Sequence, residues 1–140
     1  MIIYVLDPDT VTRQQANRVD ILRRLEQIPS TQVFTTVITL REQIRGRLAV
    51  VDRAAEGTAL LQAYRQLPAT VDYFKQVHLP PFTIEAAAQL QQLREQKLRV
   101  GTQDLRIAAI VLSVDGILVT SNRRDFAKVP RLQIEDWYVS

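Results

Sequence analysis

The chain has 140 residues, 46% of them hydrophobic, and a formal net charge of +3 at pH 7. This length and composition are typical of one globular domain with its own core, so we expect a single domain over residues 1–140. The absence of cysteine excludes disulfides, thiolate zinc sites and cysteine nucleophiles, and it fits a reducing cytoplasm. The apolar opening MIIYVL is too short for a signal peptide or a membrane span.

Histidine and arginine set further bounds on function. The single histidine, His78, argues against a serine–histidine triad and a histidine zinc site, which both need suitable partners. Because Leu-Pro-Pro follows it, we expect it in a loop. Arginine supplies 15 of the 18 basic residues, and its planar guanidinium binds phosphate in a bidentate way. This composition permits nucleic-acid binding, but a solvated basic surface would explain it equally well.

The first half of the chain alternates between strand-like and helix-like patterns. Continuous apolar runs predict strands buried on both faces, and apolar residues at helical spacing predict helices. We expect a strand over 1–6, a helix from Val19 up to Pro29, a strand over 32–35, a helix over 37–48 capped by Thr36, a helix over 52–66 closed by Pro68, and a short helix over 70–76.

The second half predicts the same alternation. We expect a helix capped by Thr83 and running through Leu93, a helix capped by Thr102 and stopped by Gly116, a strand over 117–120, a loop or short helix over 121–126, and an edge strand over 132–134. Repeated alternation of strand and helix is typical of an α/β domain with a mainly parallel sheet. The predicted fold class is therefore a three-layer α/β/α sandwich.

Acidic or amide side chains follow the expected strands or begin the helices after them. They are Asp7, Glu42, Asp104 and Asn122, with Asp125 close behind. Because the carboxyl ends of parallel strands share one edge of a sheet, we expect these residues to meet in one acidic pocket.

Each of these residues also has a purely structural explanation. Asp7 lies in good turn material, and Asp9 is a possible cap for the helix that follows. Glu42 fits a T-x-x-E capping box, and Asp104 in a first turn is favoured by the helix dipole. Asn122 and Asp125 suit a cap or turn. The joint placement, not any single residue, favours a functional site.

An acidic pocket of this kind predicts a particular chemistry. Clustered carboxylates repel one another unless a divalent cation neutralises them, and oxygen ligands favour magnesium or manganese. Such ions support phosphodiester hydrolysis, and nearby arginines would offset the repulsion between carboxylates and phosphates. The arginines nearest in sequence are Arg13, Arg41, Arg45, Arg106, Arg123 and Arg124.

Three segments resemble the PIN-domain ribonucleases of the VapC toxin type. The opening YVLDPDTVT is similar to the family's first strand and acidic motif, with Pro8 where Thr or Ser is common. TTVITLREQIRGRL resembles the stretch that carries a Glu and a Gly, here Glu42 and Gly46. VGTQDLRIAAIVLSVDGILVTSNRRDFAKVPRLQIEDW resembles the family's C-terminal block, with Asp104 at its third acid.

This resemblance implies a magnesium- or manganese-dependent endoribonuclease in which Asp7, Glu42 and Asp104 hold the metal. Many members carry a fourth acid where this chain has Asn122, so either Asn122 or Asp125 completes the site, and Thr120 joins them in orienting water or a phosphate oxygen. The resemblance further implies RNA as substrate, a small antitoxin protein as partner and a homodimer.

Two other functional classes remain open. A PIN-fold binding or regulatory module with weakened catalysis would fit Pro8 and Asn122. A phosphorylated signalling receiver is also an α/β domain with acids above its sheet, but it would need a Lys where this chain has Asn122-Arg123 after the strand ILVT.

Overall fold

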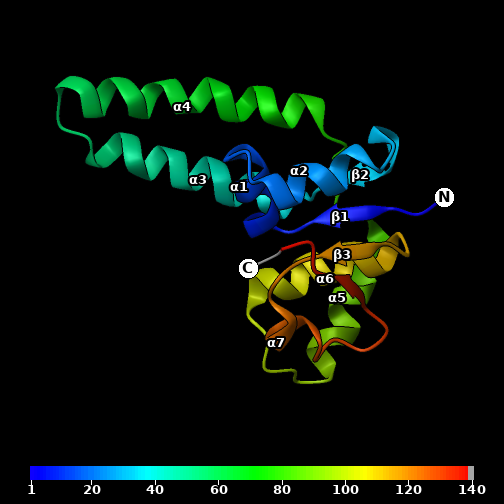
Figure 1. The fold of residues 1–140 in the computed structure, drawn as a ribbon. Coiled ribbons are helices and arrows are strands. Elements are labelled where there is room, and N and C mark those ends of the chain that lie inside the picture. Colours follow the sequence, from blue (N-terminus) through cyan, green and yellow to red (C-terminus); the bar gives the residue numbers. More distant parts are fainter. Residues whose placement is uncertain (139–140) are drawn as a thin grey trace.

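The structure is a computed structural model that describes residues 1–138. Within that range, four strands form one parallel sheet in the order β2-β1-β3-β4. Their bounds are β1 Tyr4–Leu6, β2 Val33–Phe34, β3 Ile117–Val119 and β4 Gln133–Glu135. The parallel sheet and its central position confirm the predicted fold class (Figure 1).

The sheet lies between two layers of helices, and successive side chains of β1 point to opposite layers. Val5 packs in the cluster that includes α5, α6 and α7, whereas Leu6 packs with Val11 and Ile21 on the other face. Both residues have no exposed surface. This alternation follows from the two-residue period of a strand, and it buries the sheet on both faces.

Seven α-helices and one 3-10 helix occur in the described part of the chain. Helices α3 and α4 form a long hairpin that extends beyond the sheet (Figure 1). None of the described helices is long and apolar enough to cross a membrane. The helix bounds are α1 Pro8–Gln15, α2 Val19–Glu26, η1 Ser30–Gln32, α3 Val37–Arg53, α4 Gly57–Gln76, α5 Ile84–Glu95, α6 Thr102–Ser113 and α7 Arg123–Phe126.

The prediction of two helices over 52–66 and 70–76 is wrong. Residues 52–53 belong to α3, which runs beyond the predicted end at 48, and one helix, α4, covers 57–76 with Pro68 in its interior. A proline there removes one backbone hydrogen bond and costs about 3 kcal/mol. Packing along α3 compensates: the Arg47 guanidinium donates to Thr70 Oγ1 (3.1 Å), and that hydroxyl donates to the Gln66 carbonyl (2.8 Å). Tertiary contacts therefore override the local helix-breaking signal.

Helix α1 was not predicted. The segment PDTVTRQQ contains β-branched and polar residues and buries only Thr10 and Val11, so it has a weak helical pattern. Asp7 caps this helix by accepting from the Thr10 N–H at 2.8 Å, and Pro8 occupies its first position. The expectation that Asp9 caps the following helix is therefore wrong, and so is a simple turn role for Asp7.

Most of the other helix ends agree with the sequence. Thr36 and Thr83 cap α3 and α5 as expected, each accepting from a backbone N–H three residues on. Helix α6 begins one residue earlier than expected, at Thr102, because Gly101 rather than Thr102 is its cap. His78 lies exposed in the segment between α4 and α5, as predicted. It forms an isolated β-bridge with Phe34, and the two rings are 5.0 Å apart and tilted by 36°.

Gly116 does not itself adopt the left-handed conformation that ends α6. That conformation belongs to Asp115, at φ 52°. Gly116 instead permits close packing, because a Cβ on it would lie 3.1 Å from the Ile3 carbonyl oxygen. The glycine is therefore needed where the chain enters β3 close to β1, and less for ending the helix.

Candidate active site

The predicted acidic residues meet in a pocket of about 230 Å³ at the carboxyl ends of the central strands. From β1 the chain crosses first to β2 on one side and later to β3 on the other, so the order of strands reverses between β1 and β3. Open parallel sheets bind ligands at such switch points. The residues that line the pocket are Asp7, Pro8, Asp9, Glu42, Asp104, Asn122 and Phe126.

Asp7 is the most constrained carboxylate of the pocket. It follows β1 directly and is only 3% exposed. One oxygen accepts from the Thr10 N–H at 2.8 Å, and the other accepts from the Thr120 hydroxyl at 2.6 Å. Burial raises the pKa of Asp7, while the hydrogen bonds from Thr10 and Thr120 oppose that rise. The carboxylate is thus held in one orientation before any ligand arrives.

The loop after β3 forms the second wall of the pocket. Thr120 is 1% exposed, and its hydroxyl oxygen accepts the N–H of Asn122 at 3.0 Å while its hydrogen bonds Asp7. Asn122 caps α7 by accepting from the Asp125 N–H at 3.4 Å, and its amide nitrogen donates to Asp125 Oδ2 at 3.2 Å. Asn122 lines the pocket; Asp125 does not, although its negative charge is near enough to raise the pKa of Asp104.

Glu42 and Asp104 reach the pocket from two different helices. Glu42 lies in the second turn of α3, which Thr36 caps, so the alternative T-x-x-E box starting at Thr39 does not form the helix end. Asp104 lies in the first turn of α6. Burial raises the pKa of Asp104, and the nearby carboxylates of Asp125, Glu42 and Asp7 raise it further. The acids therefore lie near enough for their negative charges to oppose one another's ionisation.

The donor set fits a hard divalent cation. Four carboxylates, those of Asp7, Asp9, Glu42 and Asp104, line this small pocket together with the Asn122 amide. A cation among them would relieve the repulsion that raises the pKa of Asp104. Within residues 1–138, however, no three His, Cys, Asp or Glu side chains form a group that could hold an ion as they stand. Binding would therefore require the carboxylates to draw together.

A network beside the pocket was not predicted from the sequence. The Arg13 guanidinium donates to Ser121 Oγ at 2.6 Å, and that hydroxyl donates to Asp136 Oδ1 at 2.9 Å. The Arg13 guanidinium also lies 4.3 Å from the ring centroid of Tyr138. This network braces the loop that carries Thr120 and Asn122. Arg13 lies 108 positions from Ser121 in sequence, and no local pattern connects the two.

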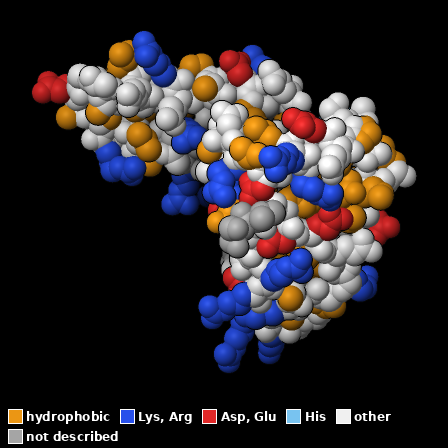
Figure 2. Space-filling model, in the orientation of Figure 1, with side chains coloured by type: hydrophobic (Ala, Val, Ile, Leu, Met, Phe, Trp, Pro, Cys, Tyr) orange, Lys and Arg blue, Asp and Glu red, His pale blue; other side chains and the backbone are white. Residues whose placement is uncertain are grey.

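The candidate arginines are distributed unevenly around the pocket. Arg13 is engaged by Ser121, and Arg106 donates to Gln103 within α6 at 3.3 Å. Arg41 and Arg45 line a hollow along α3. Arg123 lines a separate groove between α2 and β4, whereas Arg124 lines neither. In the view of Figure 2, Lys and Arg side chains gather both on the α3–α4 hairpin and on the lower part of the molecule.

These features define the class of the chain: an α/β/α domain whose parallel sheet carries a carboxylate pocket at its switch point. No protein-family model matches the sequence. The chain is 27% identical to the tRNA(fMet)-specific endonuclease VapC of Salmonella typhimurium, covering 98% of this chain and 99% of that protein. It is also 27% identical to Ribonuclease VapC1 of Haemophilus influenzae, covering 96% of this chain and 98% of the relative.

Solved structures show the same fold. The DNA-bound VapBC structure from Salmonella typhimurium matches with a TM-score of 0.79 at 23% identity, over 99% of this chain and 100% of that one. VapBC2 from Rickettsia felis, bound to a promoter DNA fragment, matches with a TM-score of 0.78 at 23% identity. This match covers 98% of this chain and 100% of that one. The predicted resemblance to PIN-domain ribonucleases of the VapC type is confirmed.

Proposed function

We propose that this chain is an endoribonuclease that hydrolyses RNA phosphodiester bonds with magnesium or manganese, and that it is the toxin of a toxin–antitoxin pair. The observation that carries the proposal is the pocket in which Asp7, Glu42, Asp104 and Asn122 converge at the switch point of the sheet. Relatives named as a tRNA-specific endonuclease and as a ribonuclease, similar over nearly the whole chain, support the same activity.

In this proposal Asp7, Glu42 and Asp104 hold the metal. A bound divalent ion would supply a water of lowered pKa and would neutralise charge on the phosphate. Asp7 enters the site already oriented by Thr10 and Thr120, so little side-chain freedom is lost on binding. Asp104 would also be stabilised in its ionised form by a cation, because burial and neighbouring acids oppose its ionisation.

Asn122 and Asp125 act as one unit in completing the site. Asn122 faces the pocket, while Asp125 accepts from its amide nitrogen and so fixes its orientation. The side-chain oxygen of Asn122 bonds the N–H of Asp125 only at 3.4 Å, a long bond that leaves this oxygen able to orient a water or phosphate oxygen. We infer that Asn122 replaces the missing acid directly and that Asp125 supports it.

The decisive assay is cleavage of RNA with manganese by the native chain and by Asp7→Asn and Asp104→Asn, with Asp72→Asn as a matched control on the exposed surface of α4. We expect the two pocket variants to lose cleavage and the control to retain it. Equal residual cleavage by all four proteins would refute the roles of these carboxylates. Absence of cleavage by the native chain would favour a PIN-fold binding or regulatory module.

The expected partner is a small antitoxin, since the structural neighbours are VapBC complexes. Expression of the chain alone should arrest bacterial growth, and co-expression of a short reading frame adjoining its gene should restore it. A homodimer is also proposed, and light scattering of the purified chain would measure its mass. Growth that continues unchanged despite full expression of an RNA-cleaving chain would contradict the toxin assignment.

A further inference from the structure

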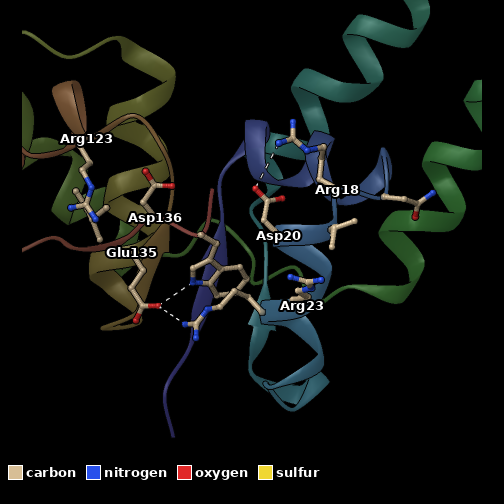
Figure 3. Close-up of a pocket in the computed structure, with 11 residues that line it drawn as sticks. Arg18, Asp20, Arg23, Arg123, Glu135 and Asp136 are labelled. Carbon is tan, nitrogen blue, oxygen red and sulfur yellow. Dashed lines mark hydrogen bonds and ion pairs between the residues drawn. The ribbon is translucent and has the colours of Figure 1, made fainter. Parts of the chain in front are cut away.

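A groove of about 810 Å³ lies in the described part of the chain, and none of the proposed catalytic residues lines it. Helix α2 forms one wall, and the segment from β4 to Trp137 forms the other (Figure 3). Its lining carries four arginines, whose side chains differ in what they contact. They are Arg18, Arg23, Arg24 and Arg123, and the acidic residues of the lining are Asp20, Glu135 and Asp136.

Every acid of the groove already has a partner. Asp20 lies 3.7 Å from the Arg18 guanidinium, and Glu135 accepts at 3.0 Å both from Arg24 and from the indole N–H of Trp137. Figure 3 shows these contacts along the two walls. Two of the four arginines therefore balance acids of the groove itself.

The third acid, Asp136, has partners other than arginine. Its Oδ1 accepts from the Ser121 hydroxyl and from the Tyr138 N–H, both at 2.9 Å. These bonds tie the groove wall to the loop after β3. Asp136 thus holds no guanidinium of the groove in an ion pair among the described residues.

Arg23 and Arg123 are the guanidinium groups of the groove that no acidic side chain of residues 1–138 neutralises. Both are exposed, and Figure 3 shows that they come from opposite sides, Arg23 from α2 and Arg123 from α7. Two unpaired guanidinium groups facing one open groove form a site for an anion that spans it.

The groove adjoins the acidic pocket. Arg123 is the residue after Asn122, which lines that pocket, and Asp136 of the groove bonds Ser121 in the same loop. A phosphodiester chain placed at the carboxylates would be repelled there, so its affinity must come from cations along its flanks. Arg123 stands where the chain would leave the pocket, and Arg23 stands across the groove from it.

We propose that this groove binds the phosphate backbone of single-stranded RNA beside the scissile phosphate, with Arg23 and Arg123 as its contacts. The inference rests on the proposed nuclease function and extends it to the path of the substrate. Trp137 is 4% exposed and already packed against Tyr4, so it offers no free face for stacking bases. Recognition is therefore by phosphate charge and independent of base sequence.

Binding is measured apart from cleavage in the Asp104→Asn background, with a fluorescein-labelled single-stranded RNA of about a dozen nucleotides and fluorescence anisotropy across a salt series. The Arg23→Ala/Arg123→Ala pair should weaken binding on the order of tenfold. Each phosphate contact contributes roughly 0.7 to the slope of log affinity against log salt, so loss of two contacts should reduce that slope by about 1.4. Arg23→Lys/Arg123→Lys should retain most of that slope.

The matched control removes the same charge elsewhere, with Arg53→Ala/Arg65→Ala on the α3–α4 hairpin. An equal loss of RNA affinity in the control pair would show that net charge causes the effect, and it would overturn the groove proposal. Unchanged RNA binding by the Arg23→Ala/Arg123→Ala pair would overturn the groove proposal as well. It would also be overturned if poly-glutamate occupied the groove and RNA did not displace it.

The same variants separate this inference from the proposed function. With Asp104 intact, the groove pair should raise the KM for RNA cleavage and leave kcat nearly unchanged. Cleavage with no change in KM would refute the groove alone. Salt-dependent RNA binding that needs Arg23 and Arg123, by a chain that never cleaves, would refute the nuclease proposal and retain the groove proposal.

Discussion

The hydroxyl of Thr120 is the smallest group on which the geometry of the acidic pocket depends. It donates to Asp7 Oδ2 at 2.6 Å and accepts the N–H of Asn122 at 3.0 Å, so one atom joins the ends of β1 and β3. Thr120→Val removes this atom while preserving the shape of the side chain. Asp7 would then remain buried with one donor fewer, and the Asn122 N–H would lose its acceptor.

The expected cost follows from these two bonds. Loss of a hydrogen bond to a buried charged group costs about 1.5–3 kcal/mol, and loss of a neutral one costs about 1 kcal/mol. We therefore expect Thr120→Val to lower the free energy of unfolding by about 3 kcal/mol. For a domain of this size that corresponds to a fall of about 10 °C in melting temperature. Thr120→Ser keeps the hydroxyl and should lose much less.

Urea unfolding at neutral and acidic pH tests the reasoning. Because Thr120 stabilises the ionised form of Asp7 and lowers its pKa, the difference between native and Thr120→Val proteins should shrink as protonation of Asp7 sets in at lower pH. A valine variant within about 0.5 kcal/mol of the native protein would refute the role of this bond. Equal destabilisation by the serine variant would show that packing, not the hydroxyl, is responsible.

Three further changes test the site and the fold. The pKa of Asp104 is raised by burial and by neighbouring acids, so its ionisation destabilises the metal-free fold as pH rises through that pKa. Asp104→Asn should therefore raise the metal-free melting temperature at neutral pH and abolish stabilisation by millimolar magnesium or manganese. A native melting curve that manganese does not shift would count against the site. Gly116→Ala should cost about 1–3 kcal/mol in urea unfolding because of the Ile3 carbonyl, while Gly46→Ala, in open space within α3, should stabilise by about 0.5–1 kcal/mol. Pro68→Ala should stabilise α4 by up to about 3 kcal/mol by calorimetry, and no gain would mean that α4 is adapted to its proline.

Local sequence patterns were sufficient for the sheet and for most helix ends. Short apolar runs predicted the strands, because strands covered on both faces need continuous apolar residues. Thr36 and Thr83 predicted two helix starts, since a threonine hydroxyl accepts a backbone N–H at the helix cap. Where the pattern was weak, as in α1, or where Pro68 interrupted it, packing decided the outcome.

The same division applies to the site. Residue types and their positions at strand ends were enough to select Asp7, Glu42, Asp104 and Asn122, because parallel strands bring their carboxyl ends to one edge. Only the tertiary structure showed that Asn122 lines the pocket, while Asp125 accepts from its amide and is not among the lining residues. The direction of a side chain depends on the turn that carries it, and that turn depends on distant partners.

The sequence by itself determined an α/β chain with acids placed for a divalent ion and a surface rich in arginine. Only the tertiary structure decided which arginines are free to bind a phosphate chain. Arg24 is neutralised by Glu135 across 111 positions of sequence, whereas Arg23, its neighbour in the chain, has no acidic partner among the described residues. Charge pairing depends on distances in space, and adjacent residues of a helix point in different directions.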